Sequence, residues 1–329
     1  MKRKIVLIIE DELVQKLALQ MELENRGFKV LSADDIESAR ELLRKFGQDA
    51  DVAVVDMMLE PSFIKSKNKE SAGAANEKTV TGADLCIEYL CQSRTKSLQE
   101  STKLITPEFI ILSAHNERID YYEKAIDLGV AAYLLKSVVP NEAVISHIRA
   151  LAIRHALKAM GSTELDEIMA IAENSSDRFE AIAQFCEKIL VPEFEAVCGA
   201  PFVILLGAGH ETFKCGGEAE LPDGFNPAYS MIQRLAHGQS NLEGPFIFEN
   251  QSILLTSDSK SIEIYQRLDS AVFLPYCVGE NLRLTIGILK DTKNKYVLSE
   301  EPQKFGKILD QHLHASILEH WIDILTKMT

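Results

Sequence analysis

The stretch KIVLIIEDE, residues 4–12, decides the fold of the first half of the chain. Its five consecutive apolar residues, Ile5 to Ile9, are typical of a strand that is covered on both faces, as strands of parallel sheets are. Two acids, Glu10 and Asp11, follow at once, so carboxylates stand where the predicted strand ends. A signal peptide also has a basic start and a short apolar run, but these acids and the lack of a small-residue cleavage site favour a β-strand.

The alternation of strand and helix that begins here continues through residues 1–155. Short apolar runs predict strands, and apolar residues at helical spacing predict helices. The further strands are expected at 28–31, 52–55, 109–112 and 131–135, and the helices at 14–26, 35–46, 83–92, 118–128 and from Pro140 onward. Asp34 or Asp35 is expected to cap the second helix. Five such repeats specify an α/β fold with a doubly wound, five-stranded parallel sheet.

Two polar segments interrupt the repeats. Residues 61–81 are rich in Ala, Ser and Lys and show no periodicity, and a loop of that length in a compact domain is either functional or disordered. We expect a disordered insertion there and a shorter polar insertion at 93–106.

The second half of the chain changes character twice. Helical periodicity runs beyond the sheet domain, through 164–173 and 177–196, so a helical linker is expected at 156–175. Strands then predominate. They are expected at 201–206, within 207–224, and at 245–248, 252–255, 271–278 and 282–289, with helices at 227–236 and 300–327. Residues 279–281 are typical of a hairpin loop. An α+β domain with an antiparallel sheet is therefore expected at 176–329.

Composition and charge exclude several classes of protein. The chain has 329 residues and a net charge of −14, and residues 156–329, with 14 basic and 25 acidic residues, carry −11 of it. Such a domain repels phosphate backbones, so we expect no nucleic-acid partner. No apolar run reaches the ~18 residues of a membrane helix, so we expect no membrane association. The six cysteines lie far apart and form no CxxC pair, which favours buried, reduced thiols in a cytoplasmic protein.

Chemically versatile side chains stand at the carboxyl ends of four predicted strands. Glu10 and Asp11 end the first, Asp56 the third, Ser113 the fourth and Lys136 the fifth. In an open α/β sheet this edge binds ligands, at the point where the strand order reverses. Taken singly, an acid after a strand is usually a helix cap, a lysine a surface residue and a serine a turn residue. Their coincidence at one edge favours a shared site.

These residue types suit phosphoryl transfer to a carboxylate. A carboxylate can accept a phosphoryl group as an acyl phosphate, but it repels the donor, so a cation is needed. Mg²⁺ suits a carboxylate-rich oxygen site, and Glu10, Asp11 and Asp56 would hold it. Lys136 would add positive charge beside the phosphoryl oxygens, and Ser113 would donate a hydrogen bond to them.

Four strings, taken together, resemble the receiver domains of bacterial two-component response regulators over residues 1–155. They are IIEDE (8–12), VAVVDMML (52–59), FIILSAH (109–115) and AAYLLKS (131–137). The resemblance implies that Asp56 is the phospho-acceptor. It also implies that a histidine kinase or a phosphotransfer protein supplies the phosphoryl group.

The same resemblance assigns roles to the other site residues. Glu10 and Asp11, with Asp56 and the main-chain carbonyl of Met58, are implied to bind Mg²⁺. Ser113 is implied to be the switch hydroxyl, Lys136 the invariant lysine and Tyr133 the switch aromatic. For Tyr133 the alternative is an ordinary half-buried residue of a strand. The chain departs from the family at Ser137, where proline is frequent, and in the long loop after Asp56.

The second half resembles a GAF domain by its order of helices and strands, over about residues 175–329. No ligand signature accompanies the pattern, since Cys215 and Cys277 lack a neighbouring histidine and His210 and His237 stand singly. We therefore expect a non-enzymatic interaction or dimerisation domain with an unidentified output partner. The alternatives are a ligand-gated regulator, whose GAF-like domain binds a small molecule, and an enzyme with an unrecognised site in 200–290.

A homodimer is also expected. Ile153, Leu157 and Met160 lie beyond the sheet domain, and the helices at 177–196 and 300–327 carry apolar stripes. An interface between two copies related by a two-fold axis would cover all of these residues. The alternative is that the stripes pack within one chain.

Overall fold

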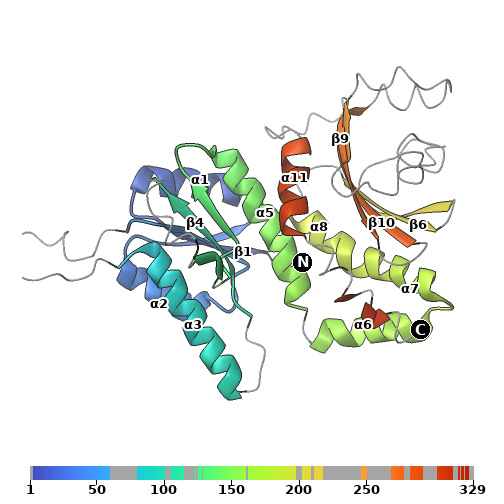
Figure 1. Cartoon of the computed structure of the whole chain (residues 1–329), viewed down its shortest axis with the longest axis horizontal. Coiled ribbons are helices and arrows are strands. Elements are labelled where there is room, and N and C mark those ends of the chain that lie inside the picture. The colour runs from blue at the N-terminus through green and yellow to red at the C-terminus, as the bar shows by residue number, and fades with distance from the viewer. Residues whose placement is uncertain are drawn as a thin grey trace, which may run out of the picture. The chain divides into compact units, whose positions relative to one another are not determined.

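The computed structural model divides the chain into two compact units, Met1–His155 and Ala156–Thr329 (Figure 1). In the first unit it describes residues 3–59, 80–100, 105–114 and 123–155, apart from 124 and 128. In the second unit it describes 156–160, 162–197, 202–208, 211–217, 246–249, 268–277, 282–291 and 302–313, with 318, 320, 321 and 323–325. Each unit is built around its own sheet.

The first unit contains the expected five-stranded parallel sheet, in the order β2-β1-β3-β4-β5. The strands are β1 (Ile5–Ile9), β2 (Lys29–Ala33), β3 (Val52–Asp56), β4 (Glu108–Ser113) and β5 (Ala132–Leu135). Every residue of β1, β3 and β4 is buried, as unbroken apolar runs predict for strands with helices on both faces. The strand order reverses between β1 and β3, so the ligand-binding edge is expected beyond the carboxyl ends of these two strands.

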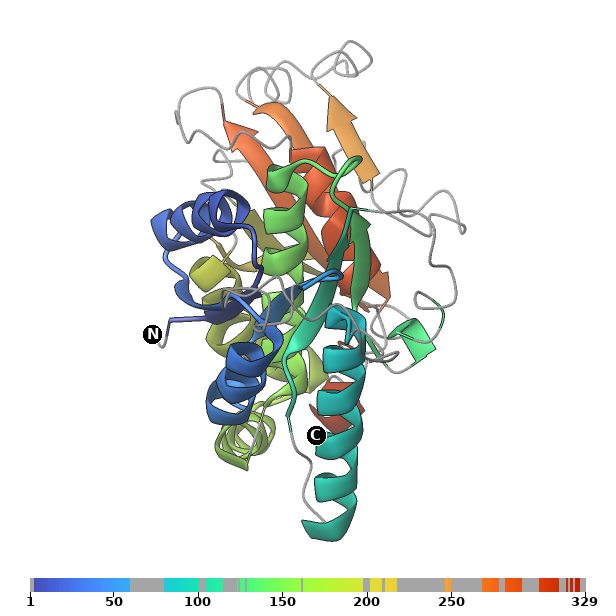
Figure 2. The ribbon, with the colours of Figure 1, turned by 90° about the vertical axis from the view of Figure 1, so that its left-hand side faces the viewer.

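Helices cover this sheet. They are α1 (Leu13–Asn25), α2 (Ile36–Phe46), α3 (Gly82–Glu100) and α5 (Asn141–Lys158), and α3 is the long cyan helix in Figure 2. One apolar core joins Leu7 of β1 to Leu43 of α2 and Leu85 of α3. Asp35 caps α2, as expected, since its side chain accepts a hydrogen bond from Ser38 N at 2.8 Å.

The polar segment that was expected to be an insertion at 93–106 is partly helical. α3 continues to Glu100, so the prediction of a helix confined to 83–92 was wrong. Gln, Arg, Lys and Glu are good helix formers, and contacts one turn apart support the extension, such as Thr95 Oγ1 donating to Cys91 O at 2.9 Å. Apart from Val80 and Thr81, the insertion predicted at 61–81 lies outside the described residues, as does much of the helix predicted at 118–128.

The second unit contains an antiparallel sheet, as expected, in the order β7-β6-β10-β9-β8. The strands are β6 (Phe202–Ala208), β7 (Glu211–Gly216), β8 (Phe246–Glu249), β9 (Leu268–Cys277) and β10 (Leu282–Asp291). β9 and β10 pair in the register of the expected hairpin, with Leu274 opposite Ile286. The helix expected at 227–236 and the strand expected at 252–255 lie outside the described residues.

The helices of the second unit depart from the prediction at one place. They are α6 (Ser162–Asn174), α7 (Arg178–Phe185), α8 (Val191–Val197) and α11 (Pro302–His312). The single helix expected at 177–196 is interrupted by a π-helical turn, η2 (Cys186–Leu190), which joins α7 to α8. Across the described ranges, no helix combines the length and the apolar character needed to cross a bilayer.

Several residues of the apolar stripes that suggested a dimer are buried in the single chain, whereas Met160 is only partly buried. Ile153 and Leu157 of α5 are fully buried, and so is Leu309 of α11. The indole N–H of Trp321 donates to the carbonyl oxygen of Leu157 at 2.9 Å, so this part of α5 contacts the C-terminal segment of the same chain. Ile153, Leu157 and Leu309 therefore need no second copy to cover them, which supports the alternative that these parts of the stripes pack within one chain. The homodimer stays a prediction.

Candidate functional site

The acidic residues converge at the carboxyl ends of β1 and β3. The parallel register pairs Ile9 with Val55, so the strands end with Glu10 and Asp56 side by side. Glu10, Asp11 and Asp56 each offer a carboxylate oxygen, and these atoms lie within 4.8 Å of one another. Glu10 and Asp56 are buried, whereas Asp11 is half-buried. The structure thus brings together the three acidic side chains that were predicted to bind a metal ion.

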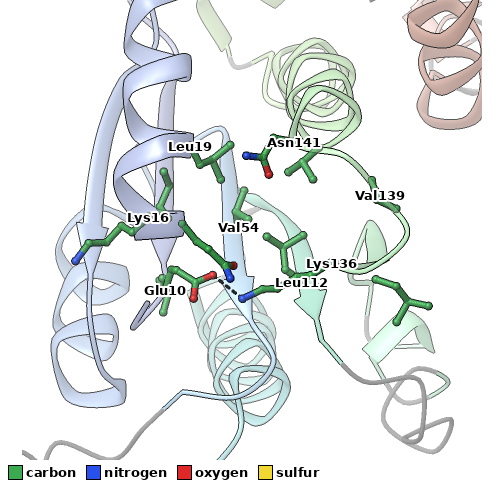
Figure 3. A pocket seen from close by; sticks show the side chains of 13 residues that line it. Glu10, Lys16, Leu19, Val54, Leu112, Lys136, Val139 and Asn141 are labelled. Carbon is green, nitrogen blue, oxygen red and sulfur yellow. Dashed lines mark hydrogen bonds and ion pairs between the residues drawn. The ribbon is translucent and has the colours of Figure 1, made fainter. Parts of the chain in front are cut away.

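Lys136 joins this group from the end of β5. The strand pairs Leu135 with Ser113, and Lys136 N donates to Ser113 O at 2.8 Å. The ammonium Nζ of Lys136 donates to Glu10 Oε2 at 2.8 Å and to Asp56 Oδ2 at 2.9 Å. Figure 3 shows the bond to Glu10. A solvated surface lysine, which was the alternative for this residue, would make neither bond.

Charge is crowded in this group. The group holds three carboxylates and one ammonium, so negative charge exceeds positive charge by two when all three carboxylates are ionised. Burial raises the pKa of Glu10 to about 7, and the charge of Asp56 adds to the rise, although Lys136 opposes it. Burial lowers the pKa of Lys136, but the hydrogen bonds and charges of Glu10 and Asp56 outweigh this effect. The pKa of Lys136 is therefore raised above its ordinary value. A divalent cation with oxygen ligands would balance the excess, so the residues present fit Mg²⁺.

Backbone N–H groups orient two of the carboxylates. Met58 N donates to Asp56 Oδ1 at 3.2 Å, so the loop after β3 holds one oxygen of this side chain. Glu12 N donates to Glu10 Oε1 at 3.3 Å. Glu12 also occupies the N-cap position of α1, without a capping bond from its side chain. Asp11 is therefore not the cap of α1, which was the alternative role for this residue.

Ser113 and Tyr133 lie at different depths in neighbouring strands. β3 pairs Asp56 with Leu112 of β4, so Ser113 lies one residue nearer the edge than this pair, and it is buried. Tyr133 lies in β5 two residues before its last residue, and its half-buried ring packs against the apolar core that includes α2 and α3. The structure therefore places Ser113 at the edge and Tyr133 deeper in the sheet. The role of the Met58 carbonyl stays a prediction.

A cavity of about 250 Å³ adjoins the site (Figure 3). Glu10 and Lys136 form part of its polar wall. Leu19 of α1, Val54 of β3 and Leu112 of β4 form part of its apolar wall. The ammonium and one of the acids are thus bordered by open space on the side of α1 and α5.

Comparison with known proteins finds similarity only among solved structures. No protein-family model matches the chain, and no curated protein shows a significant match. A response regulator receiver domain protein from Clostridium thermocellum is 19% identical, with 45% of this chain and 94% of that chain covered and a TM-score of 0.32. The Francisella response regulator 1452 receiver domain is 21% identical, with 46% of this chain and 97% of that chain covered and a TM-score of 0.33. A response regulator receiver protein from Pseudomonas putida is 23% identical, with 42% of this chain and 90% of that chain covered and a TM-score of 0.31.

Gly82 is a position beside the site that the sequence reasoning missed. A Cβ atom on Gly82 would lie 1.8 Å from the carbonyl oxygen of Asp56, so glycine lets the start of α3 approach the end of β3 this closely. A signal was available in the pattern Thr81-x-x-Asp84. Thr81 N donates to Asp84 Oδ2 at 3.0 Å and Asp84 N donates to Thr81 Oγ1 at 3.2 Å, a capping box that begins α3 at this glycine.

Proposed function

We propose that the chain is a response regulator whose first unit accepts a phosphoryl group on Asp56 and whose second unit passes the signal to a partner. The observation that carries this proposal is the Lys136 ammonium, which donates to both Glu10 and Asp56 within a group of three carboxylates. A structural ion pair needs one carboxylate for each lysine. When all three carboxylates are ionised, one ammonium leaves part of their negative charge uncompensated, and a divalent cation would balance it.

Asp56 supplies the nucleophile. One carboxylate oxygen attacks the phosphorus of a phosphohistidine, so that an O–P bond forms, the N–P bond of the donor breaks, and an acyl phosphate remains on Asp56. The leaving imidazole takes up a proton from solvent. Lys136, which holds Asp56 Oδ2 before transfer, then pairs with the phosphoryl oxygens. Ser113, at the end of the adjacent strand, donates a hydrogen bond to the same oxygens.

Glu10, Asp11, Asp56 and the main-chain carbonyl of Met58 are the proposed Mg²⁺ ligands. When bound there, the ion would offset the repulsion between the Asp56 carboxylate and the incoming phosphoryl oxygens. The chain's own groups orient the acceptor, with Met58 N at one oxygen of Asp56 and Lys136 Nζ at the other. Removal of the ion is expected to abolish transfer, because the repulsion between the carboxylate and the phosphoryl oxygens would then be uncompensated.

Exposed apolar side chains around the site suit the docking of a protein donor. Four of them stand within three residues of a site residue in sequence and are 43% to 73% exposed, namely Leu13, Val14, Met58 and Val138. Leu17, also exposed, continues the apolar surface along α1. Exposed apolar patches on soluble proteins commonly mark interaction surfaces. We propose that a histidine kinase or a phosphotransfer protein covers these residues during transfer.

For the second unit we propose a GAF-like interaction or dimerisation role without a reaction of its own. An antiparallel sheet accompanied by helices supports a domain of this kind. The net charge of −11 over 156–329 disfavours nucleic acid as the output partner. The ligand-gated alternative stays a prediction, because residues 218–245 and 250–267 lie outside the described ones.

Phosphate incorporation from a small phosphodonor tests the proposal. The full chain is incubated with acetyl phosphate and Mg²⁺, and the wild type is compared with Asp56→Asn and Asp49→Asn. Asp49 is an exposed residue outside the acidic group and serves as the matched control. We expect base-labile incorporation in the wild type and the control, and none in Asp56→Asn or after chelation of the metal. Equal incorporation in Asp56→Asn would refute the assignment.

A further inference from the structure

Cys186 and Cys215, which are far apart in sequence, both occupy irregular backbone in the second unit. Cys186 is the first residue of the π-helical turn η2 between α7 and α8. In the neighbouring strands, consecutive residues of β6 pair with Lys214 and Gly216 of β7, which leaves Cys215 as the extra residue of a β-bulge. π-helical turns and bulges both recur at functional sites, and a bulge redirects a side chain.

Two further contacts hold η2 and its flanking helices against β7. Phe179 of α7 meets Phe213 of β7 edge to face, with ring centroids 4.7 Å apart. Gly216 of β7 lies so close to Val191 of α8 that a Cβ atom there would be 2.7 Å from a methyl group of Val191. The two cysteines lie between these contacts in their respective segments. Packing on both sides therefore keeps their side chains together.

The two thiols are neighbours but differ in exposure. Both are free, Cys186 is buried, and Cys215 is partly exposed. The hydrogen bond between the two side chains and the burial of Cys186 raise the pKa of Cys186 well above its ordinary value. Cys215 is therefore the thiol that a solute reaches first. The sequence, which has no CxxC pair, predicted buried, reduced thiols. Burial was wrong for Cys91, which is exposed, and for Cys215, which is partly exposed. The fold also brings together two cysteines that sequence spacing alone did not connect.

We propose that Cys186 and Cys215 form a covalent modification site, at which a low-molecular-weight disulfide converts the two thiols into an intrachain disulfide. The Cys215 thiolate attacks one sulfur of the small disulfide, so that a mixed disulfide forms and one small thiolate leaves. Cys186 then loses its proton and attacks the Cys215 sulfur, so that the protein disulfide forms and the second small thiolate leaves. The two protons end on the two released thiols. The protein loses two electrons and the small disulfide gains them.

This bond would change one edge of the antiparallel sheet. β7 is an edge strand of the sheet, and it is held to η2 by non-covalent packing while the thiols are reduced. The disulfide would tie the segment α7–η2–α8 to β7 covalently. A domain proposed to act by interaction would thereby have a second chemical input, separate from Asp56.

Peptide mapping of the full chain tests the proposal. The protein is incubated with oxidised glutathione, the remaining thiols are alkylated, and the protein is digested with trypsin without reduction. Cys186 then falls in peptide 179–188 and Cys215 in peptide 215–234, whereas Cys198 and Cys277 fall in other peptides. We expect a cross-linked product of 179–188 and 215–234 that dithiothreitol separates. Cys91→Ser, which removes an exposed thiol of the first unit, should keep this product, and Cys215→Ser should lose it.

The wild-type result decides the question without relying on a variant that must fold. Recovery of peptide 179–188 only in its uncross-linked form would overturn the proposal. A link from peptide 215–234 to the peptide of Cys198 or Cys277 would overturn it as well. Neither result would bear on phosphorylation of Asp56, which involves no thiol.

Discussion

Replacing Lys136 by methionine tests how the acidic group is held together. Methionine keeps most of the apolar stem and removes the ammonium that donates to Glu10 and Asp56. Breaking a buried ion pair by removing one partner costs about 3–5 kcal/mol, because the other charge stays buried and uncompensated. The lysine side chain is 17% exposed, against 5% for Glu10 and 9% for Asp56, so water screens the pair in part. We therefore expect the free energy of unfolding to fall by about 3 kcal/mol in the absence of metal.

Mg²⁺ is expected to return most of this stability. A ligand that binds only the folded state adds about 2.7 kcal/mol at a concentration of 100 times its Kd. The Lys136→Met variant has lost the ammonium that competes for Glu10 and Asp56, so it should gain more from the ion than the wild type gains.

Urea unfolding at pH 8, with Mg²⁺ or with a chelator, measures both effects. That pH lies above the pKa of Glu10, which is raised to about 7, so Glu10 is mostly charged in the wild type. Lys29→Met, at an exposed lysine of β2, is the matched control. Unfolding of Lys136→Met at the same urea concentration as the wild type would refute this prediction, and so would equal stabilisation of both proteins by Mg²⁺.

Gly82, His147 and the cysteine pair give three further tests. Gly82→Ala would place a Cβ atom 1.8 Å from the carbonyl oxygen of Asp56. It should therefore lower the free energy of unfolding by about 1–3 kcal/mol and slow the phosphorylation of Asp56. An unchanged phosphorylation rate would contradict this prediction. Burial lowers the pKa of His147 from 6.5 to about 4. The unfolded chain then binds the proton more tightly, so stability is full above pH 6.5 and falls by up to about 3 kcal/mol as the pH drops to 4. His147→Gln should flatten this part of the unfolding profile, and an unaltered profile would assign the loss to other groups. The Cys186–Cys215 disulfide closes a loop of about 30 residues and should add roughly 3 kcal/mol, so calorimetry should find a higher Tm for oxidised wild type but not for Cys215→Ser.

The sheet and its acidic edge could be predicted because the signals are local in sequence. Each central strand is an apolar run that ends at a polar residue, as Ile9 is followed by Glu10 and Val55 by Asp56. Parallel strands bring such ends to one edge, so the convergence of these acids follows from the fold class alone. The capping role of Asp35 was predictable for the same reason, since its partner Ser38 is three residues away.

The features that could not be predicted depend on contacts between distant segments. The close approach of Gly82 to the carbonyl oxygen of Asp56 depends on how α3 packs against β3, and the spacing of apolar residues does not predict that packing. The pairing of Cys186 with Cys215 needs a π-helical turn and a bulge, and both break the regular spacing on which the predictions relied. An apolar stripe, such as the one that includes Leu157, indicates that a surface is covered but does not indicate by which chain.

The location of the phosphoryl group is the most direct test of Asp56 as the acceptor. The full chain is phosphorylated with acetyl phosphate and Mg²⁺, the acyl phosphate is reduced with borohydride, and tandem mass spectrometry of the peptides locates the reduced residue. If Asp56 is the phospho-acceptor, Asp56 and no other residue is converted to homoserine. Reduction of Glu10, Asp11 or another carboxylate, with Asp56 unmodified, would contradict this assignment.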